Sequence, residues 1–145
     1  MVGIKFQIRN EHDVVLDKIF ENIDLKNYFL KITNEEVFDE KRNNFFEQQI
    51  YTSLKFKNLI KLRKHYPVFL TLQLYKDNKN MVEIQNYDNY LNSHCELLLY
   101  IIDNIFVEIY SKNENYLKAI KHNALKNKYV NVQDINDFSK FSLYY

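Results

Sequence analysis

Two apolar runs separated by only two polar residues constrain the fold of this chain more than any other feature. The runs cover residues 97–102 and 105–110, and Asp103-Asn104 lies between them. Runs of this length that are rich in branched and aromatic residues are typical of strands. Asp and Asn tolerate the positive φ angles that a two-residue hairpin turn needs. The pattern therefore predicts a β-hairpin over 97–110, at or near the centre of a sheet.

A two-residue turn also predicts which side chains face each other across this hairpin. Ile102 would lie opposite Ile105, and Glu108 would lie opposite Leu99 on the other face of the sheet. Because the first arm is apolar at every position, it is predicted to be buried on both faces, whereas Glu108 indicates a wetter side for the second arm.

The hydrophobic period changes after the hairpin and predicts a helix followed by a strand. Ser111 and Glu114 fit a capping box, Asn113 is an alternative N-cap, and Asn127 fits a left-handed C-cap. The inward stripe of this helix is Leu117, Ile120 and Ala124. A new strand begins near Tyr129. Strand–helix–strand units of this length form right-handed crossovers, so this last strand is predicted to pair in parallel within the same sheet.

The remaining elements follow from the same periodicities. Strands are expected at 4–8, 28–32, 68–75 and 81–85, and helices at 10–23 and 54–65, with a short helix begun by Asp88. The helix at 54–65 is expected to turn Leu59, Leu62 and Tyr66 inward, supported by Phe56 and Ile60, and to end before Pro67. Gly3 fits an ordinary frayed chain end. Residues 33–52 are compatible with a strand, a short helix or a loop, and the tail 138–145 with an edge strand or a surface segment.

Together these elements predict an α/β fold, with α+β as the alternative. The expected architecture is one domain over 1–145, with a mixed sheet of five to seven strands and three to four flanking helices.

Composition places the chain among globular proteins of a reducing compartment. Hydrophobic residues make up 46% and charged residues 27%, which argues against disorder. A single cysteine cannot form an internal disulfide, the first residues lack the apolar core of a signal peptide, and no apolar run reaches the roughly 20 residues of a membrane span. The expected location is the cytoplasm, without membrane attachment.

The sequence argues against several common sites. Phosphate-binding loops need glycines, and the chain has one. The four histidines have no zinc-ligand spacing, so neither a metal nor a cofactor is predicted. His94 and Cys95 are adjacent in a strand and should point to opposite faces, which disfavours a Cys–His nucleophile. Cys95 is predicted to be buried and inert.

Acidic and basic clusters leave two alternatives open. Acids crowd residues 35–40, where they fit a solvated surface; these are Glu35, Glu36, Asp39 and Glu40. Glu108 would become a candidate acid if it were buried without a partner, because its pKa would then rise. The second cluster is a candidate basic surface made of Lys55, Lys57, Lys61, Arg63 and Lys64. Aromatic residues nearby suit single-stranded nucleic acid, but the net charge of +1 and the single arginine in the cluster disfavour it.

Three stretches give the chain a family resemblance. They are Gly3-Ile-Lys-Phe-Gln-Ile-x-Asn10, Tyr87-Asp-x-Tyr-Leu-Asn-Ser-x-Cys-Glu-Leu97 and Val107-Glu-Ile-Tyr-Ser-Lys112, where x is any residue. The chain resembles, over nearly its whole length, a group of small proteins of Gram-positive bacteria that share a domain of unknown function. The resemblance implies a bacterial single-domain protein; it implies no activity, so it assigns no functional residue.

The function hypothesis is a non-enzymatic cytosolic module that binds another protein, as inhibitors and immunity proteins do. It depends on the compact size, the lack of a catalytic constellation and the many tyrosines. One alternative is a small hydrolase or ligand-binding enzyme that uses Glu108, or His94, with the acidic 35–40 segment. The other is a nucleic-acid adaptor acting through Lys55–Lys64. The oligomeric state stays open.

Overall fold

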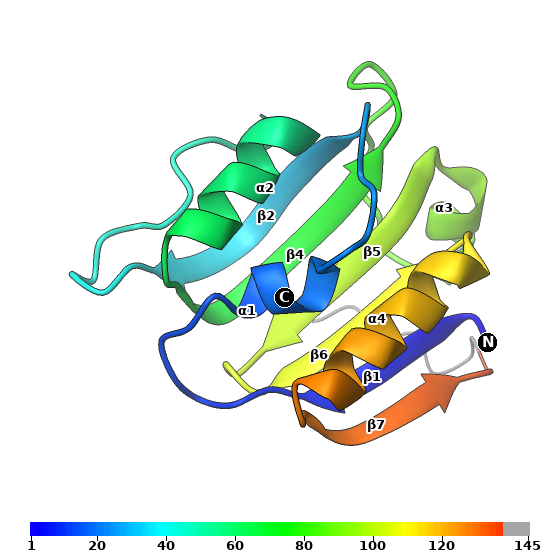
Figure 1. Ribbon diagram of the computed structural model, residues 1–145. Helices are drawn as coiled ribbons and strands as arrows, with labels where there is room; N and C mark the ends of the chain where they lie inside the picture. Colours follow the sequence, from blue (N-terminus) through cyan, green and yellow to red (C-terminus); the bar gives the residue numbers. More distant parts are fainter. Residues whose placement is uncertain (138–145) are drawn as a thin grey trace.

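A computed structural model describes residues 1–137, which form seven strands and four helices (Figure 1). In chain order the elements are β1 (Gly3–Gln7), α1 (Val15–Phe20), β2 (Phe29–Phe38), β3 (Ile50–Thr52), α2 (Ser53–Leu62), β4 (Tyr66–Tyr75), α3 (Tyr87–Asn92), β5 (Cys95–Ile102), β6 (Phe106–Ser111), α4 (Glu114–Lys126) and β7 (Val130–Ile135). The prediction for the tail 138–145 falls outside the described residues.

All seven strands join one sheet, in the order β3-β2-β4-β5-β6-β1-β7. The predicted hairpin is central, since β5 is the fourth of the seven strands. Every neighbouring pair is antiparallel, so the expected mixed sheet is wrong and the fold is α+β rather than α/β. The predicted parallel pairing is also wrong, because the connection through α4 passes over β1. As a result, β7 pairs with β1 and runs in the direction of β6 without touching it.

Three helices, α1, α2 and α4, cover the same face of the sheet, and α3 lies by the start of β5 (Figure 1). Under the three helices lies the main apolar core, which takes Leu97, Leu99 and Ile101 from β5. The opposite face, which α1, α2 and α4 leave uncovered and which we call the helix-free face, carries a second buried cluster that includes Leu98, Tyr100 and Tyr90, the last contributed by α3. Burial of β5 on both faces is therefore confirmed.

The register of the hairpin differs from the prediction by one residue. Asp103 and Asn104 adopt the expected left-handed conformation, with φ of 56° and 52°, and the Ile105 N–H closes the turn on the Ile102 carbonyl at 3.3 Å. The Ile105 carbonyl, however, accepts a hydrogen bond from Ile8 at 2.8 Å, so Ile105 acts as a third loop residue. Ile102 then pairs with Phe106.

This shift exchanges the two faces of β6 relative to β5. Glu108 lies opposite Tyr100 on the helix-free face, and not opposite Leu99. Val107 and Ile109 join the main core instead. A slip of one residue moves every side chain of a strand to the other face, which explains why a small local difference changes the surroundings of a candidate residue.

Two helices differ from their predicted limits. Helix α1 begins at Val15 rather than directly after Asn10, although every residue predicted to face inward is buried: Val15, Leu16, Ile19, Phe20 and Ile23. Helix α2 buries Phe56 and Ile60, the predicted supporting residues, and packs half-buried Leu59 against the core. Leu62 is 78% exposed, so the predicted inward stripe is wrong at this position. The helix ends before Pro67 as predicted, but at Leu62 rather than at residue 65.

The helix caps and one strand also differ from the predictions. Asn113, the alternative cap, begins α4 because the Ser111 hydroxyl instead accepts from the Asn113 N–H and donates to the Glu96 carbonyl. Asn86, rather than Asp88, caps α3. The left-handed residue after α4 is Lys128, with φ of 59°, and not Asn127. The strand expected at 81–85 is irregular chain, in which the Val82 N–H donates to the Tyr75 hydroxyl at 3.5 Å rather than to a strand partner.

The undecided segment 33–52 is mainly strand and turn. Strand β2 continues to Phe38 with register irregularities between Thr33 and Val37, where Asn34 has a φ of 46°. A turn follows, and short β3 forms one edge of the sheet next to β2.

Candidate functional site

Glu108 lies in a polar row that crosses three strands on the helix-free face. Lys5 of β1 lies directly between Glu108 of β6 and Gln133 of β7. The Lys5 and Gln133 side chains are exposed, and that of Glu108 is half-buried. An ammonium, a carboxylate and an amide thus lie next to one another on rigid strands.

The polar row separates two hollows, which together we name the polar groove. One hollow has a volume of about 390 Å³ and continues to Gln7, Ile102, Phe106 and Asn131. The other has a volume of about 310 Å³ and continues toward Tyr110 and the end of β7. Lys5, Glu108 and Gln133 line both hollows.

Gly3 shapes this groove through its cross-strand partner, Tyr110. A Cβ at position 3 would approach the Tyr110 ring to 2.9 Å and the Ile109 carbonyl oxygen to 2.7 Å. Because position 3 has no side chain, the ring fits there, and the Tyr110 hydroxyl donates to Glu108 Oε1 at 3.1 Å. The interpretation of Gly3 as a frayed end is therefore wrong. Glu108 has a hydrogen-bond partner, so the condition for a buried, unpartnered acid is not met.

His94 and Cys95 form no catalytic pair. His94 is exposed between α3 and β5, whereas Cys95 is fully buried and its thiol donates to the Leu97 carbonyl at 3.1 Å. Burial raises the pKa of Cys95 to about 12, which keeps the thiol protonated at neutral pH. The prediction that Cys95 is buried is confirmed.

The acidic segment divides into separate environments. Glu35 and Glu36 line a hollow beside the irregular part of β2, and burial raises the pKa of Glu35, whose Oε2 has no hydrogen-bond partner among the described residues. Asp39 instead accepts from the Asn43 and Lys41 N–H groups and from Arg63, and these bonds lower its pKa. Glu40 is exposed.

The acidic segment and Glu108 do not form a carboxylate pair. Strands β2 and β6 are three places apart in the sheet. At roughly 4.8 Å per strand spacing, that is about 14 Å between strands, beyond the reach at which two carboxylates act on one bond. The structure therefore does not bring together the residues of the hydrolase alternative.

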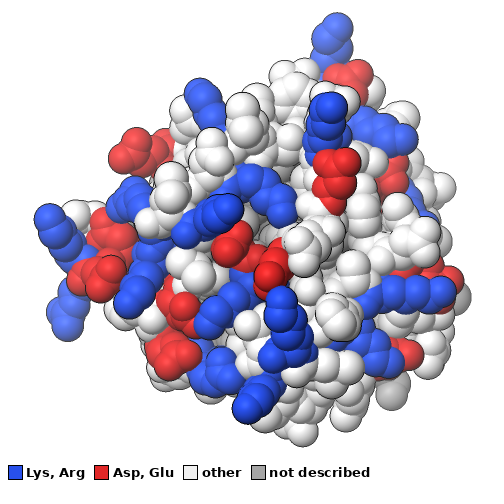
Figure 2. All heavy atoms as spheres, in the orientation of Figure 1, with Lys and Arg blue, Asp and Glu red and all other residues white. Residues whose placement is uncertain are grey.

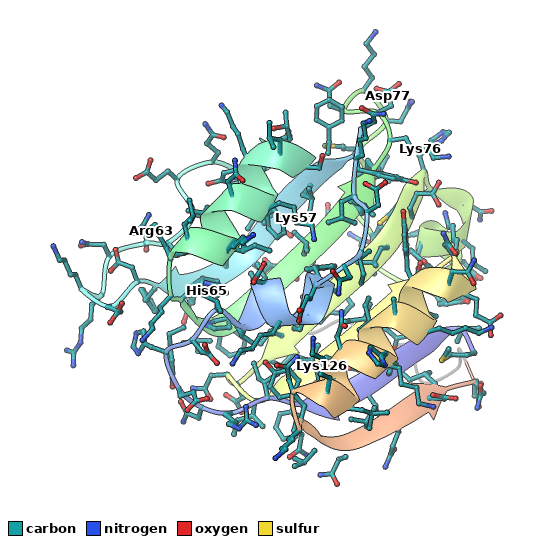
Figure 3. All side chains as sticks on the ribbon, viewed as in Figure 1. Lys57, Arg63, His65, Lys76, Asp77 and Lys126 are labelled. Atoms are coloured by element: carbon teal, nitrogen blue, oxygen red, sulfur yellow. The ribbon has the colours of Figure 1, made fainter. Side chains whose placement is uncertain are left out.

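Two members of the basic cluster bind other parts of the chain. Lys57 donates to the Phe20 carbonyl at the end of α1 at 2.8 Å, and partial burial lowers its pKa. Figure 3 shows Lys57 between α2 and α1. Arg63 binds the Asp39 carboxylate at 3.1 Å and lies over the Phe45 ring. The exposed lysines that remain are Lys55, Lys61 and Lys64.

The solvent face of α2 is partly apolar. Leu54 is 71% and Leu62 78% exposed, and both lie on the side of the helix that faces away from Phe56 and Ile60. We name Leu54, Lys55, Asn58, Lys61 and Leu62 the α2 ridge. On this side of the molecule, Figure 2 shows Lys and Arg side chains interspersed with Asp and Glu rather than gathered into one basic field.

His65 is a buried polar residue that sequence analysis did not single out. Its Nε2 accepts from the Leu16 N–H at 3.0 Å, so Nδ1 carries the hydrogen and donates to the Arg63 carbonyl at 2.9 Å. Burial lowers the pKa of His65 to about 4. Figure 3 places His65 beside the start of α1, where it satisfies a helix N–H that the N-cap, Val14, cannot. Its role is structural.

Residues 1–137 hold neither a cluster of metal ligands nor a helix suited to a membrane. In this part of the chain, three or more His, Cys, Asp or Glu side chains nowhere gather closely enough to hold a metal ion. None of the helices described is both long and apolar enough to cross a membrane.

Comparisons with known proteins agree with the family resemblance. The profile of "Protein of unknown function (DUF2691)" matches residues 1–144. The chain is also similar to the uncharacterized protein YncE of Bacillus subtilis (strain 168), with 31% identity over 142 residues that cover 93% of this chain and 92% of the relative. No solved structure matches the chain. Because both matches span almost the whole sequence, the chain belongs to the DUF2691 family of proteins of unknown function.

Proposed function

We propose that this chain is a cytosolic, non-enzymatic module that binds an acidic partner protein through the α2 ridge. The observation that carries the proposal is the exposure of Leu54 and Leu62, at 71% and 78%, on a regular helix. The two leucines are eight positions apart, or about 12 Å along the axis, which suits two apolar anchors of one interface. Single exposed leucines are ordinary, but two on one helix face form a small apolar strip.

The charges around this strip indicate the chemistry of the partner. Lys55 and Lys61 belong to the α2 ridge and Lys64 follows it, and none of the three forms an ion pair within the described part of the chain. No Asp or Glu occurs between Glu47 and Asp77 in the sequence. An apolar surface bordered by carboxylates would complement this arrangement, and opposite charges would also speed the encounter.

A hollow beside Leu54 offers a place for a side chain of the partner. It has a volume of about 900 Å³ and lies between the α1–β2 connection and the start of α2. Its apolar lining includes Leu25, Tyr28 and Phe29. Interface anchors commonly pair with such pockets on the opposite surface, so this end of the α2 ridge is the expected centre of the contact.

The same observations disfavour the nucleic-acid alternative. Lys57 and Arg63 are engaged with Phe20 and Asp39, which leaves three lysines and no free arginine in the original cluster. Leucines offer no planar surface for base stacking, which single-stranded sites use.

Site-specific crosslinking would test the proposal. A photo-crosslinking amino acid at position 58 in the full chain, expressed in its own organism, should trap a protein. The same probe at position 91, on exposed α3, is the control. The trapped protein is then purified and its affinity for the wild-type chain measured by calorimetry. The double variant L54D/L62D should weaken binding by about a hundredfold, since each leucine contributes on the order of 1.5 kcal/mol or more.

The control variant V82D/L91D alters two exposed apolar residues away from α2 and should bind like the wild type. Urea unfolding should show that both double variants remain folded. The proposal is wrong if position 58 traps nucleic acid, if it traps nothing beyond the control position, or if L54D/L62D binds the trapped protein as tightly as the wild type.

A further inference from the structure

The polar groove on the helix-free face carries an inference that does not depend on the α2 ridge. Its two hollows, of about 390 and 310 Å³, meet at the row formed by Glu108, Lys5 and Gln133. The larger hollow falls within the size range of pockets for small molecules. Its walls are strands, which hold side chains in place more firmly than loops do.

The charges of the row are adjacent but not bonded to each other. Lys5 and Glu108 are direct cross-strand partners, whose Cβ atoms lie roughly 4.5–5.5 Å apart in an antiparallel pair. Opposite charges at such a position commonly form an ion pair, yet no ion pair joins them within residues 1–137. Glu108 accepts the Tyr110 hydroxyl instead, and the ammonium of Lys5 is exposed to solvent. The ammonium and the carboxylate are both available to a ligand that carries the complementary charges.

One end of the groove is apolar. Phe106 is 45% exposed although it lies on an interior strand of the sheet, and Ile102 lies beside it in the wall of the larger hollow. The pairing of β1 with β7 shifts register between Lys5 and Gln7, where Asn131 adopts a φ of 56°. Such bulges re-aim side chains next to binding sites. Gln7 and Asn131 thereby border the hollow opposite Phe106.

We propose that the polar groove binds a free amino acid with an apolar side chain. Lys5 would bind the ligand carboxylate, and Glu108 would bind the ligand ammonium. Phe106 and Ile102 would contact the side chain, and the amides of Gln7, Asn131 and Gln133 would accept or donate the remaining hydrogen bonds. The short spacing of the two protein charges selects a ligand whose own charges are attached to one carbon. A peptide, whose terminal charges are further apart, fits this spacing less well.

Heteronuclear NMR of the full chain provides the test. Phenylalanine, leucine and valine are titrated separately into the labelled protein, and N-acetylated amides of the same amino acids and dipeptides serve as comparison ligands. At least one free amino acid should give saturable shifts at the amides of residues 5–7, 106–108 and 131–133, with a Kd on the order of 1 mM or below. The substitutions K5M and E108Q should each weaken it at least about tenfold, the value of one lost charge contact.

Matched controls separate recognition from a general effect on the protein. K118M removes an exposed lysine of α4 and should leave the Kd unchanged. The spectra of K5M and E108Q away from the groove show whether each variant keeps its fold. The inference is overturned if no free amino acid gives saturable shifts, if acetylated amides or dipeptides bind as tightly, or if K5M and E108Q bind like K118M. None of these outcomes bears on the α2 ridge, because the groove lies on the opposite face of the sheet.

Discussion

The two faces of the sheet are built from alternate residues of the same strands, but they differ in chemistry. The helix-covered face is packed almost entirely with aliphatic and phenylalanine side chains. The helix-free face has a smaller cluster that includes Tyr75, Tyr90, Tyr100 and Tyr110, and beside it lies the polar groove. The helix-covered face therefore supplies stability, whereas the helix-free face combines packing with hydrogen-bonding groups that are open to a ligand.

Tyrosines account for much of this difference. A buried tyrosine needs a partner for its hydroxyl, and the Tyr75 hydroxyl donates to Gln73 at 2.8 Å. Burial raises the pKa of Tyr75 and of Tyr90, so both remain neutral at physiological pH. A face built in this way combines apolar rings with fixed polar atoms, which a purely aliphatic face cannot do.

Neighbouring leucines of β5 provide the strongest test of the comparison. Leu98 and Leu99 are both fully buried, but Leu99 points under the helices and Leu98 toward the tyrosines. Leu99→Ala should lower the free energy of unfolding by about 4 kcal/mol and Leu98→Ala by about 2–3 kcal/mol, because aromatic rings on the less covered face can move into the gap. Urea unfolding of both variants measures the difference. Equal losses would mean that both faces are equally rigid cores.

Local pattern was enough to predict most of the elements. Alternation predicts β4, the Asp103-Asn104 turn predicts the hairpin, and the apolar stripe predicts α4, because each depends on residues that are close in sequence. The register of the hairpin could not be predicted in the same way. It depends on a hydrogen bond between Ile8 and Ile105, which are 97 positions apart. The same limit applies to β7, whose partner β1 is at the other end of the chain.

The candidate site was predictable only in part. Glu108 is recognisable as a charge inside an apolar run, but its neighbours Lys5 and Gln133 come from strands whose order local pattern does not specify. The buried role of His65 had only an indirect sign in the sequence, which is the missing N-cap of α1. Helix α1 begins after Val14, which has no side-chain oxygen to cap it, so another polar group had to satisfy the first N–H groups.

The free energy of unfolding should fall in acid mainly because of His65, which lies on the helix-covered face. Burial lowers the pKa of His65 from 6.5 to about 4, so the unfolded chain binds a proton in this range that the folded chain does not. Neutral His65 contributes about 3 kcal/mol to the free energy of unfolding. This contribution is complete above pH 6.5 and is lost as the pH falls through 4. Urea unfolding at a series of pH values between 7 and 4 should show this loss.

Two substitutions identify the histidine responsible for this loss. His65→Gln keeps a neutral hydrogen-bonding side chain and should remove most of the pH dependence in this window. His94→Gln, at an exposed position, should leave it unchanged. Cys95 and Tyr75 on the helix-free face have raised pKa values and stay neutral throughout, and carboxylates with lowered values, such as Asp39, contribute only at more acidic pH. The raised pKa of Glu35 acts in the opposite direction, because the folded chain takes up that proton first as the pH falls. If His65→Gln retained the full loss, the acid sensitivity would have another origin.

The smallest expected effect tests how tightly the helix-free face is built near the polar groove. Gly3→Ala should lower the free energy of unfolding by about 1–3 kcal/mol, because the added methyl group meets the Tyr110 ring and the Ile109 carbonyl oxygen. Gln7→Ala, a half-buried position of the same strand, should stay within about 0.5 kcal/mol of the wild type. In a double-mutant cycle with Tyr110→Ala, the cost of Gly3→Ala should fall but not vanish, since the contact with Ile109 remains. If Gly3→Ala left the free energy of unfolding unchanged, the result would instead fit a frayed strand end. The Tyr110 ring, whose hydroxyl donates to Glu108, would then not depend on the glycine for its position.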